Sequence, residues 1–328
     1  MPNSVNATAV SAVASSTISP ANDVHPIVHD PHLPAGAGKR LEACLIYATY
    51  GRPETLSLTY DSVRRQTIRP ASVIVSCVHE GDAGRLVECK EVRVIVGAKG
   101  LCRQRNLALA EIPNSADVIV FFDDDFVPHP RWIESVLAVF EARPEIAAVT
   151  GNLLADGIKG PGLSIEEAFA RVDAAPDGDT SWVAQPYSPY GCNMAFRRSM
   201  IEGATFDERL VLYGWLEDRD FGAVLANRGG ATIKIGTARG VHMGVKGGRT
   251  SGVQLGYSQV VNPVYLNRKG TMRAWLVAQH IFGNVASNLF RAFRPEPFID
   301  RAGRLRGNLM GFFDLARGRI IPEKAATL

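Results

Sequence analysis

The chain has 328 residues, 46% of them hydrophobic, and a formal net charge of +3. These values are typical of a globular protein with a large core and exclude a fibrous or wholly disordered chain. The sequence contains no run of about 18 apolar residues, so a membrane-spanning helix is not expected. No signal peptide is evident at the N-terminus. The five cysteines lack metal-binding spacing, which is typical of reduced thiols in a cytosolic protein.

The charge is unevenly distributed along the chain. Residues 267–328 contain 11 Lys and Arg against 4 Asp and Glu, a surplus of seven positive charges. The remainder of the chain, with 25 basic and 29 acidic residues, therefore has a net charge of −4. A basic C-terminal segment on a mildly acidic body predicts an anionic surface as its partner.

The first half of the chain alternates between strand and helix patterns. Residues 1–38 are rich in Ala, Ser, Thr, Val and Pro without a sustained period, so we expect a disordered tail there. Strands are expected over 41–49, 71–78, 92–96 and 118–122, and helices over 53–66 and 101–110. This order predicts an α/β fold with a mainly parallel central sheet flanked by helices, in an α/β/α arrangement with right-handed crossovers.

The second half continues the domain and then changes character. Residues 152–185 are rich in Gly and Asp, and we expect a mobile loop region with one short helix. The other expected elements are helices over 131–142 and 215–227 and strands over 146–151, 191–198 and 232–235. We expect the α/β domain to occupy residues 39–250 and a basic helical segment to occupy residues 251–328.

The most informative stretch is the fourth strand, which ends directly on Asp123, Asp124 and Asp125. Three adjacent carboxylates repel one another unless a positive group lies beside them. Ligands of open α/β sheets bind outside the carboxyl ends of the strands, and carboxylate oxygens suit Mg²⁺ or Mn²⁺. The stretch therefore predicts a divalent cation that holds a phosphate-containing ligand; the alternative is a solvated acidic turn.

Several common catalytic motifs are missing from the sequence. There is no GxxxxGK[ST] loop, no GxGxxG after the first strand and no GxSxG turn. Their absence argues against a P-loop phosphotransferase, a Rossmann dehydrogenase and a serine hydrolase.

Over residues 41–250 the order of motifs resembles the family 2 glycosyltransferases, which are inverting enzymes of the GT-A fold. The resemblance rests on seven short motifs in sequence order, of which each is weak alone. They are Thr49-Tyr50-Gly51-Arg52, Gly100 with Arg105-Asn106, Phe122-Asp123-Asp124-Asp125, Asn193-Met194-Ala195-Phe196-Arg197-Arg198, Phe206-Asp207-Glu208, Glu217-Asp218-Arg219-Asp220 and His242.

The resemblance implies a role for each acid of the triad. Asp123 is expected to contact the ribose or sugar of a nucleotide-sugar donor. Asp125 is expected to bind Mn²⁺ or Mg²⁺, which stabilises the charge that develops on the departing diphosphate. Asp124 is expected in the donor site, with a structural hydrogen-bonding role at the turn as the alternative. His242 is expected as a further metal ligand, with a packed or surface histidine as its alternative.

The same resemblance makes Asp218 the expected catalytic base. An inverting transfer needs a carboxylate that accepts the proton of the acceptor hydroxyl. Glu217 is the next candidate. Helical neighbours face different directions, so Glu217 and Asp218 cannot both act as the base. Helix capping and matching of the helix dipole are the alternative roles for these acids.

The remaining donor contacts are expected at the ends of the first three strands. Glu80 and Asp82 stand where the family places an Asp that reads the nucleobase and ribose, but the surrounding sequence departs from the family pattern. The other expected donor-binding residues are Thr49, Tyr50, Arg52, Gly100, Arg105 and Arg249. The alternative role of Arg105 is an ion pair on the helix surface. For Arg249 and Lys246, the alternative is that they belong to a solvated basic loop without a donor contact. We expect a UDP- or dTDP-linked donor.

Residues 274–293 and 301–319 have the pattern of basic amphipathic helices with aromatic residues. The first of them sets six apolar residues against polar ones, namely Trp275, Ala278, Phe282, Val285, Leu289 and Phe293 against Gln279, Ser287, Asn288 and Arg291. Such helices lie at membrane interfaces. We therefore expect a cytoplasmic protein that is peripheral at the inner face of the cytoplasmic membrane; the alternatives are packing on the catalytic domain or a homodimer.

Together these features predict a metal-dependent inverting transfer of a sugar to a saccharide acceptor, which could be linked to a polyprenyl lipid. The expected process is exopolysaccharide or surface-glycan synthesis, without a nucleic-acid partner. A sugar-phosphate nucleotidyltransferase is an alternative, although such enzymes usually carry a Gly-rich basic loop after the first strand. An inactive sugar-nucleotide-binding scaffold is a third hypothesis.

Overall fold

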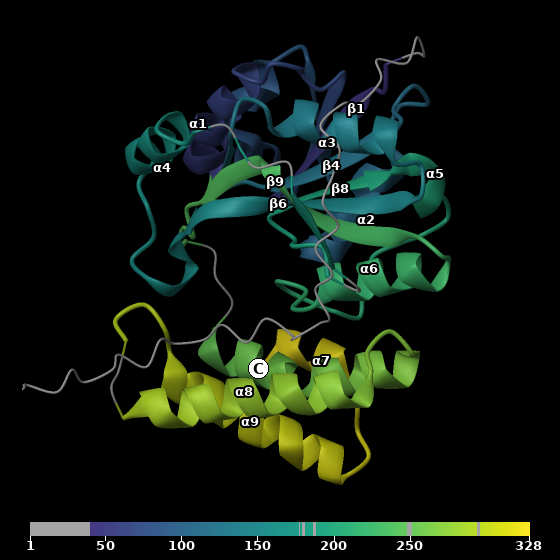
Figure 1. Ribbon diagram of the computed structural model, residues 1–328. Helices are drawn as coiled ribbons and strands as arrows, with labels where there is room; N and C mark the ends of the chain where they lie inside the picture. Colours follow the sequence, from purple (N-terminus) through teal and green to yellow (C-terminus); the bar gives the residue numbers. More distant parts are fainter. Residues whose placement is uncertain (1–39, 177, 179–180, 186–187, 248–250, 294–295) are drawn as a thin grey trace, which may run out of the picture.

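The computed structural model describes residues 40–176, 178, 181–185, 188–247, 251–293 and 296–328. The tail expected to be disordered and Arg249 lie outside the described residues. Within them, nine strands form one sheet, in which the order is β3-β2-β1-β4-β8-β6-β9-β5 and β7 pairs with β9 (Figure 1). The strands are β1 (Ala43–Thr49), β2 (Ser72–Cys77), β3 (Val92–Val96), β4 (Val118–Asp123), β5 (Phe126–Pro128), β6 (Ile146–Asp156), β7 (Trp182–Ala184), β8 (Asn193–Arg197) and β9 (Ala231–His242).

The sheet is mixed, with a parallel part formed by the first four elements of its order. β3, β2, β1 and β4 pair in parallel, whereas β8 runs antiparallel to both β4 and β6. β6 and β9 are again parallel. This arrangement confirms the α/β class and the flanking helices, and it places the ends of β1 and β4 side by side.

Helices cover both faces of the sheet, which explains why β4 is a continuous apolar run. Its side chains alternate between two cores: Val120 and Phe122 lie in one, and Ile119 and Phe121 in the other. The first core includes α1 (Pro53–Arg64) and α3 (Trp132–Ala142), and the second includes α2 (Leu101–Ala110) and α6 (Glu217–Asn227). A strand buried on both faces needs no polar alternation.

The expected loop region 152–185 is only partly a loop. β6 continues to Asp156, and the segment also contains a 3-10 turn (Gly157–Lys159), α4 (Ile165–Asp173) and β7. β9 is likewise longer than the strand expected over 232–235. The two strands stabilise each other through a parallel ladder with several register shifts, and its last pair joins Asp156 to His242. The pairing partner lies about 85 residues away in the sequence, so local pattern does not reveal the extension.

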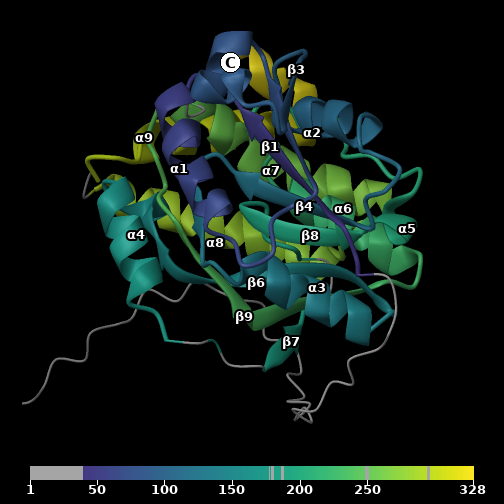
Figure 2. The ribbon, with the colours of Figure 1, turned by 90° about the horizontal axis from the view of Figure 1, so that it is seen from above.

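The C-terminal part is a bundle of α7 (Gly252–Lys269), α8 (Ala274–Ala292) and α9 (Arg301–Ala316), followed by a 3-10 segment (Pro322–Thr327). Figures 1 and 2 show it as a separate layer beneath the sheet, next to α6. Among the described residues, no helix is sufficiently long and apolar to span a bilayer. The boundary near residue 250 stays a prediction.

The bundle is attached to the α/β domain by ion pairs and apolar packing at the end of α7. Lys269 Nζ lies 2.7 Å from Asp207 Oδ2 and 2.6 Å from Asp220 Oδ2. The Thr271 hydroxyl donates a hydrogen bond to Asp220. Leu266 of α7 also joins the core that contains α6. Asp220 therefore has a structural role in docking the two layers.

We predict that Lys269→Met lowers the free energy of unfolding by about 2 kcal/mol, because Asp220 is almost fully buried and would lose its cation. Partial exposure of Lys269 reduces the effect below that of a fully buried pair. Urea denaturation measures the change. The neighbouring exposed Arg268→Met is the matched control and should change stability by less than about 0.5 kcal/mol. Equal effects of the two substitutions would contradict the docking role of Lys269.

Candidate active site

The site forms where the ends of β4, β6 and β9 meet the start of α6. β5 pairs with β9 so that Phe126 lies opposite His242, which brings the preceding Asp125 next to the histidine. The Met243 and Val245 backbone N–H groups donate to the Asp125 main-chain oxygen and to its Oδ2, at 2.9 and 2.8 Å. These bonds hold Asp125 and the residues after His242 in one rigid arrangement.

Asp123, Asp125 and His242 converge as a candidate metal site. One ligand atom from each lies within 4.8 Å of the others, and the His242 Nε2 is 3.3 Å from Asp125 Oδ1. Two carboxylates and an imidazole form a donor set that suits a divalent cation such as Mn²⁺ or Mg²⁺. The residues present therefore fit the metal that the sequence implies.

The pKa shifts of Asp125 and His242 both favour the charged form of the group. Burial alone would raise the pKa of Asp125, but contacts with His242, Arg52 and the Val245 N–H lower it to about 2. Burial alone would lower the pKa of His242, whereas its hydrogen bonds to Asp125 and Asp156 raise it to about 10. The surrounding carboxylates therefore favour positive charge at the position where these ligand atoms converge.

Asp156 orients His242. Its Oδ1 lies 3.0 Å from His242 Nδ1, and its Oδ2 accepts a hydrogen bond from the Tyr190 hydroxyl at 3.1 Å. A carboxylate on one ring nitrogen leaves the other nitrogen directed at the metal position and increases its basicity. The sequence pattern does not reveal Asp156, because it predicts a loop there; the only local signal is an acid five residues beyond the expected strand.

Asp124 faces away from this convergence. Its side chain is 1% exposed, accepts a hydrogen bond from the Thr49 hydroxyl at 2.7 Å and lies 3.2 Å from Arg52 Nη1. The Thr59 hydroxyl donates to its main-chain oxygen. Burial raises the pKa of Asp124 to about 7, against the opposing effect of Arg52. This placement supports the structural alternative, in which Asp124 holds the strand ends of β1 and β4 together.

The candidate base, Asp218, lies in the first turn of α6. Its Oδ2 accepts a hydrogen bond from the Gly191 N–H at 2.9 Å, and its Oδ1 accepts one from the Arg219 N–H at 2.7 Å. Burial raises the pKa of Asp218, and these backbone donors oppose the rise. A carboxylate with a raised pKa accepts a proton more readily, as a general base must.

The turn before α6 is strained. Leu212 and Leu216 have φ values of 61° and 78°, in the left-handed region that non-glycine residues seldom occupy. Such a conformation costs on the order of 1 to 3 kcal/mol and clusters at functional sites. This turn sets where α6 begins and thereby where Asp218 stands.

Arg105 joins the two halves of the site. It is almost fully buried in α2, forms an ion pair with Glu217, donates to the Gly191 main-chain oxygen at 3.0 Å and lies 3.4 Å from Asp123 Oδ1. Glu217 is thus committed to Arg105, and Asp218 is the neighbour free of that pair. The ion pair is buried and does not lie on a helix surface as the alternative had it. The nucleobase contact of Arg105 stays a prediction.

The other expected donor-binding residues line the ends of β1 and β2. Asp82 accepts hydrogen bonds from the Gly51 and His79 N–H groups, at 3.0 and 2.9 Å, and so holds the turn after β1. The Tyr50 ring lies 4.0 Å from Lys99 Nζ. Glu80 is exposed, Gly100 begins α2 with a φ of 136°, and Arg52 Nη1 lies 3.3 Å from Asp125 Oδ2. Their donor contacts stay predictions.

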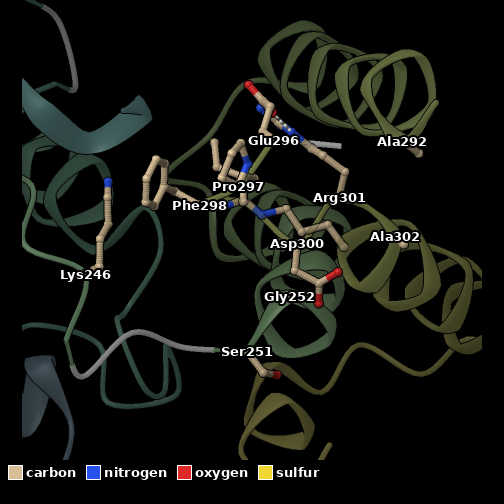
Figure 3. A pocket seen from close by; sticks show the side chains of 12 residues that line it. Lys246, Ser251, Gly252, Ala292, Glu296, Pro297, Phe298, Asp300, Arg301 and Ala302 are labelled. Carbon is tan, nitrogen blue, oxygen red and sulfur yellow. Dashed lines mark hydrogen bonds and ion pairs between the residues drawn. The ribbon is translucent and has the colours of Figure 1, made fainter. Parts of the chain in front are cut away.

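A cavity of about 720 Å³ lies beside the loop that follows β9 (Figure 3). Lys246 forms one side, and the connection between α8 and α9 forms the other, with Phe298 projecting toward the lysine. Lys246 Nζ donates to the Gly157 and Ile158 main-chain oxygens, both at 3.0 Å. The cavity therefore borders both the loop next to the metal site and the C-terminal bundle.

We predict that Asp156→Asn weakens Mn²⁺ binding by about 10- to 100-fold, because a neutral amide no longer increases the basicity of the His242 ligand. Electron paramagnetic resonance of free Mn²⁺ measures the affinity. Asp173→Asn, which changes an exposed acid of α4 that pairs with Arg65, is the control and should bind as the wild type does. Equal affinity of Asp156→Asn and the wild type would show that the His242–Asp156 pair does not serve the metal.

Comparison with known proteins relates the chain to sugar-transferring enzymes. The family model described as Glycosyl transferase family 2 matches residues 44–203. A glucosyl-dolichyl phosphate glucuronosyltransferase from Haloferax volcanii is 25% identical over 171 residues, which cover 49% of this chain and 54% of that protein. The chain thus spans about half the length of this curated relative.

The fold also has a solved counterpart. The mannosyltransferase PcManGT from Pyrobaculum calidifontis, solved in complex with GDP-Man and Mn²⁺, superposes with a TM-score of 0.54 and 17% identity. The match covers 92% of this chain and 87% of that one. At this identity the likeness establishes the fold alone. The chain therefore has the GT-A fold, and its residues 44–203 are similar to the glycosyl transferase family 2.

Proposed function

We propose that this protein is an inverting, divalent-metal-dependent glycosyltransferase that moves a sugar from a nucleoside diphosphate to a hydroxyl of a saccharide acceptor. The observation that carries the proposal is the convergence of Asp123, Asp125 and His242, joined through Arg105 to the Gly191 that holds Asp218. A metal-binding donor half and a carboxylate base are the two parts that such a reaction needs.

In the donor half, Asp125 and His242 would hold Mn²⁺ or Mg²⁺, and Asp123 is the third residue of this group. When bound, the cation neutralises charge that develops on the departing diphosphate. The structure of PcManGT with GDP-Man and Mn²⁺ supports a metal-dependent nucleotide-sugar donor. Arg52, which contacts Asp124 and Asp125, holds both carboxyl groups in place.

In the acceptor half, Asp218 accepts the hydroxyl proton as the acceptor oxygen attacks the anomeric carbon. The bond from that carbon to the diphosphate breaks on the opposite side, so the configuration inverts. The two backbone N–H donors hold the Asp218 carboxylate in position, and Arg105 keeps Glu217 from competing for the same place. Both effects lower the reorganisation needed for proton transfer.

For the finer identity of the substrates, we propose a UDP- or dTDP-linked donor and a lipid-linked saccharide acceptor in exopolysaccharide or surface-glycan synthesis. The name of the Haloferax relative includes a glucosyl-dolichyl phosphate, which supports the lipid-linked acceptor. The nucleotidyltransferase alternative is disfavoured because the turn after β1 is Thr49-Tyr50-Gly51-Arg52-Pro53, and its arginine is engaged by the aspartates of β4. The inactive-scaffold alternative is decided by the first prediction below.

We predict that Asp218→Asn retains nucleotide and metal binding but loses transfer by about 10²- to 10⁴-fold, because the amide cannot accept the proton. Radiolabelled sugar transfer gives the rate, and calorimetry with the nucleoside diphosphate gives the binding. Glu217→Gln serves as comparator: it should lower stability through the loss of the Arg105 pair. Near-normal turnover of Asp218→Asn would overturn the base assignment, and an inactive wild type across all donors would favour the scaffold.

We also predict which donors bind. In a thermal-shift panel with Mn²⁺, a UDP- or dTDP-linked sugar should raise the melting temperature, since a ligand at 100 times its Kd stabilises by about 2.7 kcal/mol. The shift should vanish in EDTA and in Asp125→Asn. A shift with GDP-linked sugars alone would show that the expected pyrimidine donor is wrong while leaving the metal-dependent mechanism intact.

A further inference from the structure

The polarity of the C-terminal bundle is partly reversed, as α8 shows. Its solvent-exposed face carries Trp275, Phe282, Phe290 and Phe293, with exposed fractions of 49%, 77%, 75% and 81%. Its buried residues are the apolar Leu276, at the end next to the α/β domain, and the polar Asn288. An amphipathic helix in a water-soluble protein turns its aromatic stripe toward the core. α8 turns its aromatic stripe outward.

The same reversal holds for α9. Leu309, Phe312 and Phe313 are exposed by 63%, 41% and 59%, whereas Asn308 and Asp314 are exposed by 1% and 2%. α8 and α9 pack against each other and against α7. Two neighbouring helices thus present aromatic side chains outward, while the interior of the bundle combines buried amides with a small apolar cluster around Tyr257 and Val261. Contiguous exposed apolar surface of this kind marks an interaction site.

The interior of the bundle is held by amide hydrogen bonds. Asn288 Nδ2 donates to Gln259 Oε1 and to Asn308 Oδ1, both at 2.9 Å. Asn308 Nδ2 donates to the Gly256 main-chain oxygen at 2.7 Å, and Gln259 Nε2 donates to Asn284 Oδ1 at 2.9 Å. Hydrogen bonds between polar side chains of adjacent helices are a common means of association where the surroundings are apolar.

Glycines allow α7 and α9 to approach closely. Gly303, Gly307 and Gly311 recur every four residues on α9. A Cβ atom built at Gly256 would collide with the Arg304 main-chain oxygen, and one at Gly307 with the Val253 main-chain oxygen. This small-xxx-small packing is typical of helices that associate in lipid, where burial of apolar surface provides no driving force.

The charges of the bundle complement an anionic surface. Each of its four acids has a partner: Glu296 pairs with Arg291 and Arg301, Asp314 with Lys324 and Glu323 with Arg209 of the α/β domain, and Asp300 caps α9. Lys269 is bound to Asp207 and Asp220, whereas the exposed Arg268, Arg306 and Arg317 present positive charge at the surface of the bundle. Arginines around an aromatic face match the headgroup region of an anionic leaflet.

We propose that α8 and α9 lie in one leaflet of an anionic bilayer, with their aromatic faces among the acyl chains and their amide-linked faces toward α7. The occupant of the exposed face is lipid. A second copy of the chain would cover the same aromatic residues, but a symmetric pair would bring the two positive surpluses together. Buried amide hydrogen bonds and close glycine contacts between helices are compatible with such surroundings.

The attachment also orients the active site, a step that rests on the proposed function. The His280 ring of α8 contacts the Trp215 ring, at 5.9 Å between centroids, and Trp215 lies three residues before the base Asp218. Phe298, 47% exposed, lines the cavity beside Lys246 (Figure 3). A lipid-linked acceptor in the same leaflet would thus present its saccharide to the active site while its lipid stays in the membrane.

Flotation of the full-length protein with vesicles tests the attachment. We expect binding to vesicles of 70% phosphatidylcholine and 30% phosphatidylglycerol, and at least tenfold weaker binding to pure phosphatidylcholine. Phe282→Ser/Phe290→Ser/Phe293→Ser should reduce binding at least tenfold, with an unchanged melting temperature because these side chains are exposed. The control Leu58→Ser/Val87→Ser/Val96→Ser, which changes apolar side chains of the α/β domain exposed by 44%, 41% and 56%, should float as the wild type does.

Two further measurements separate the alternatives. Arg306→Gln/Arg317→Gln should lose the preference for the anionic vesicles while retaining the weak binding to neutral ones. Failure of the wild type to float, or equal flotation of the triple-Phe variant, overturns the proposal. If light scattering shows a dimer that the triple-Phe variant dissolves, without vesicle binding, the face is a contact between copies. Asp218→Asn should float normally, so loss of attachment and loss of the proposed activity are distinguishable.

Discussion

The interaction on which the site depends is the neutralisation of three adjacent carboxylates at the end of a buried strand. Like charges at this spacing cannot all remain ionised in a low-dielectric environment unless cations or hydrogen-bond donors balance them. The structure separates them by partner: Arg105 faces Asp123, Arg52 and Thr49 hold Asp124, and His242 with a backbone N–H holds Asp125. Two of the three aspartates are thereby directed at a metal position and one at the framework.

This distribution couples the donor half of the site to the acceptor half. Arg105 contacts Asp123 on one side and Glu217 on the other, so a buried guanidinium links α6 to β4 in addition to their apolar packing. The strained turn that ends at Leu216 completes the positioning of Asp218. A two-substrate transfer requires the base and the donor site at a constant separation, and a buried ion pair between rigid elements provides that constraint.

The C-terminal bundle follows a different physical rule from the α/β domain. In the domain, apolar side chains of β4 fill two cores and carboxylates face the site. In the bundle, amide hydrogen bonds and close glycine contacts supplement a small apolar cluster, and aromatic side chains face outward. The ion pairs of Lys269 and the packing of Leu266 join the two parts, so a surface suited to lipid is held close to a site suited to a nucleotide sugar.

Sequence pattern alone determined the α/β order, the apolar strand with its acidic end, the acid pair at the start of α6 and His242, because runs, turns and motif order are local properties. Tertiary structure decided the rest. Asp156 becomes the partner of His242 only through the ladder between β6 and β9, which joins segments about 85 residues apart. The amphipathic pattern of α8 was visible in the sequence, but which face packs and which is exposed was decided by the hydrogen bonds of Asn288 with its neighbours. Periodicity shows that a helix has an apolar and a polar face, but the surroundings of the helix decide which face is packed.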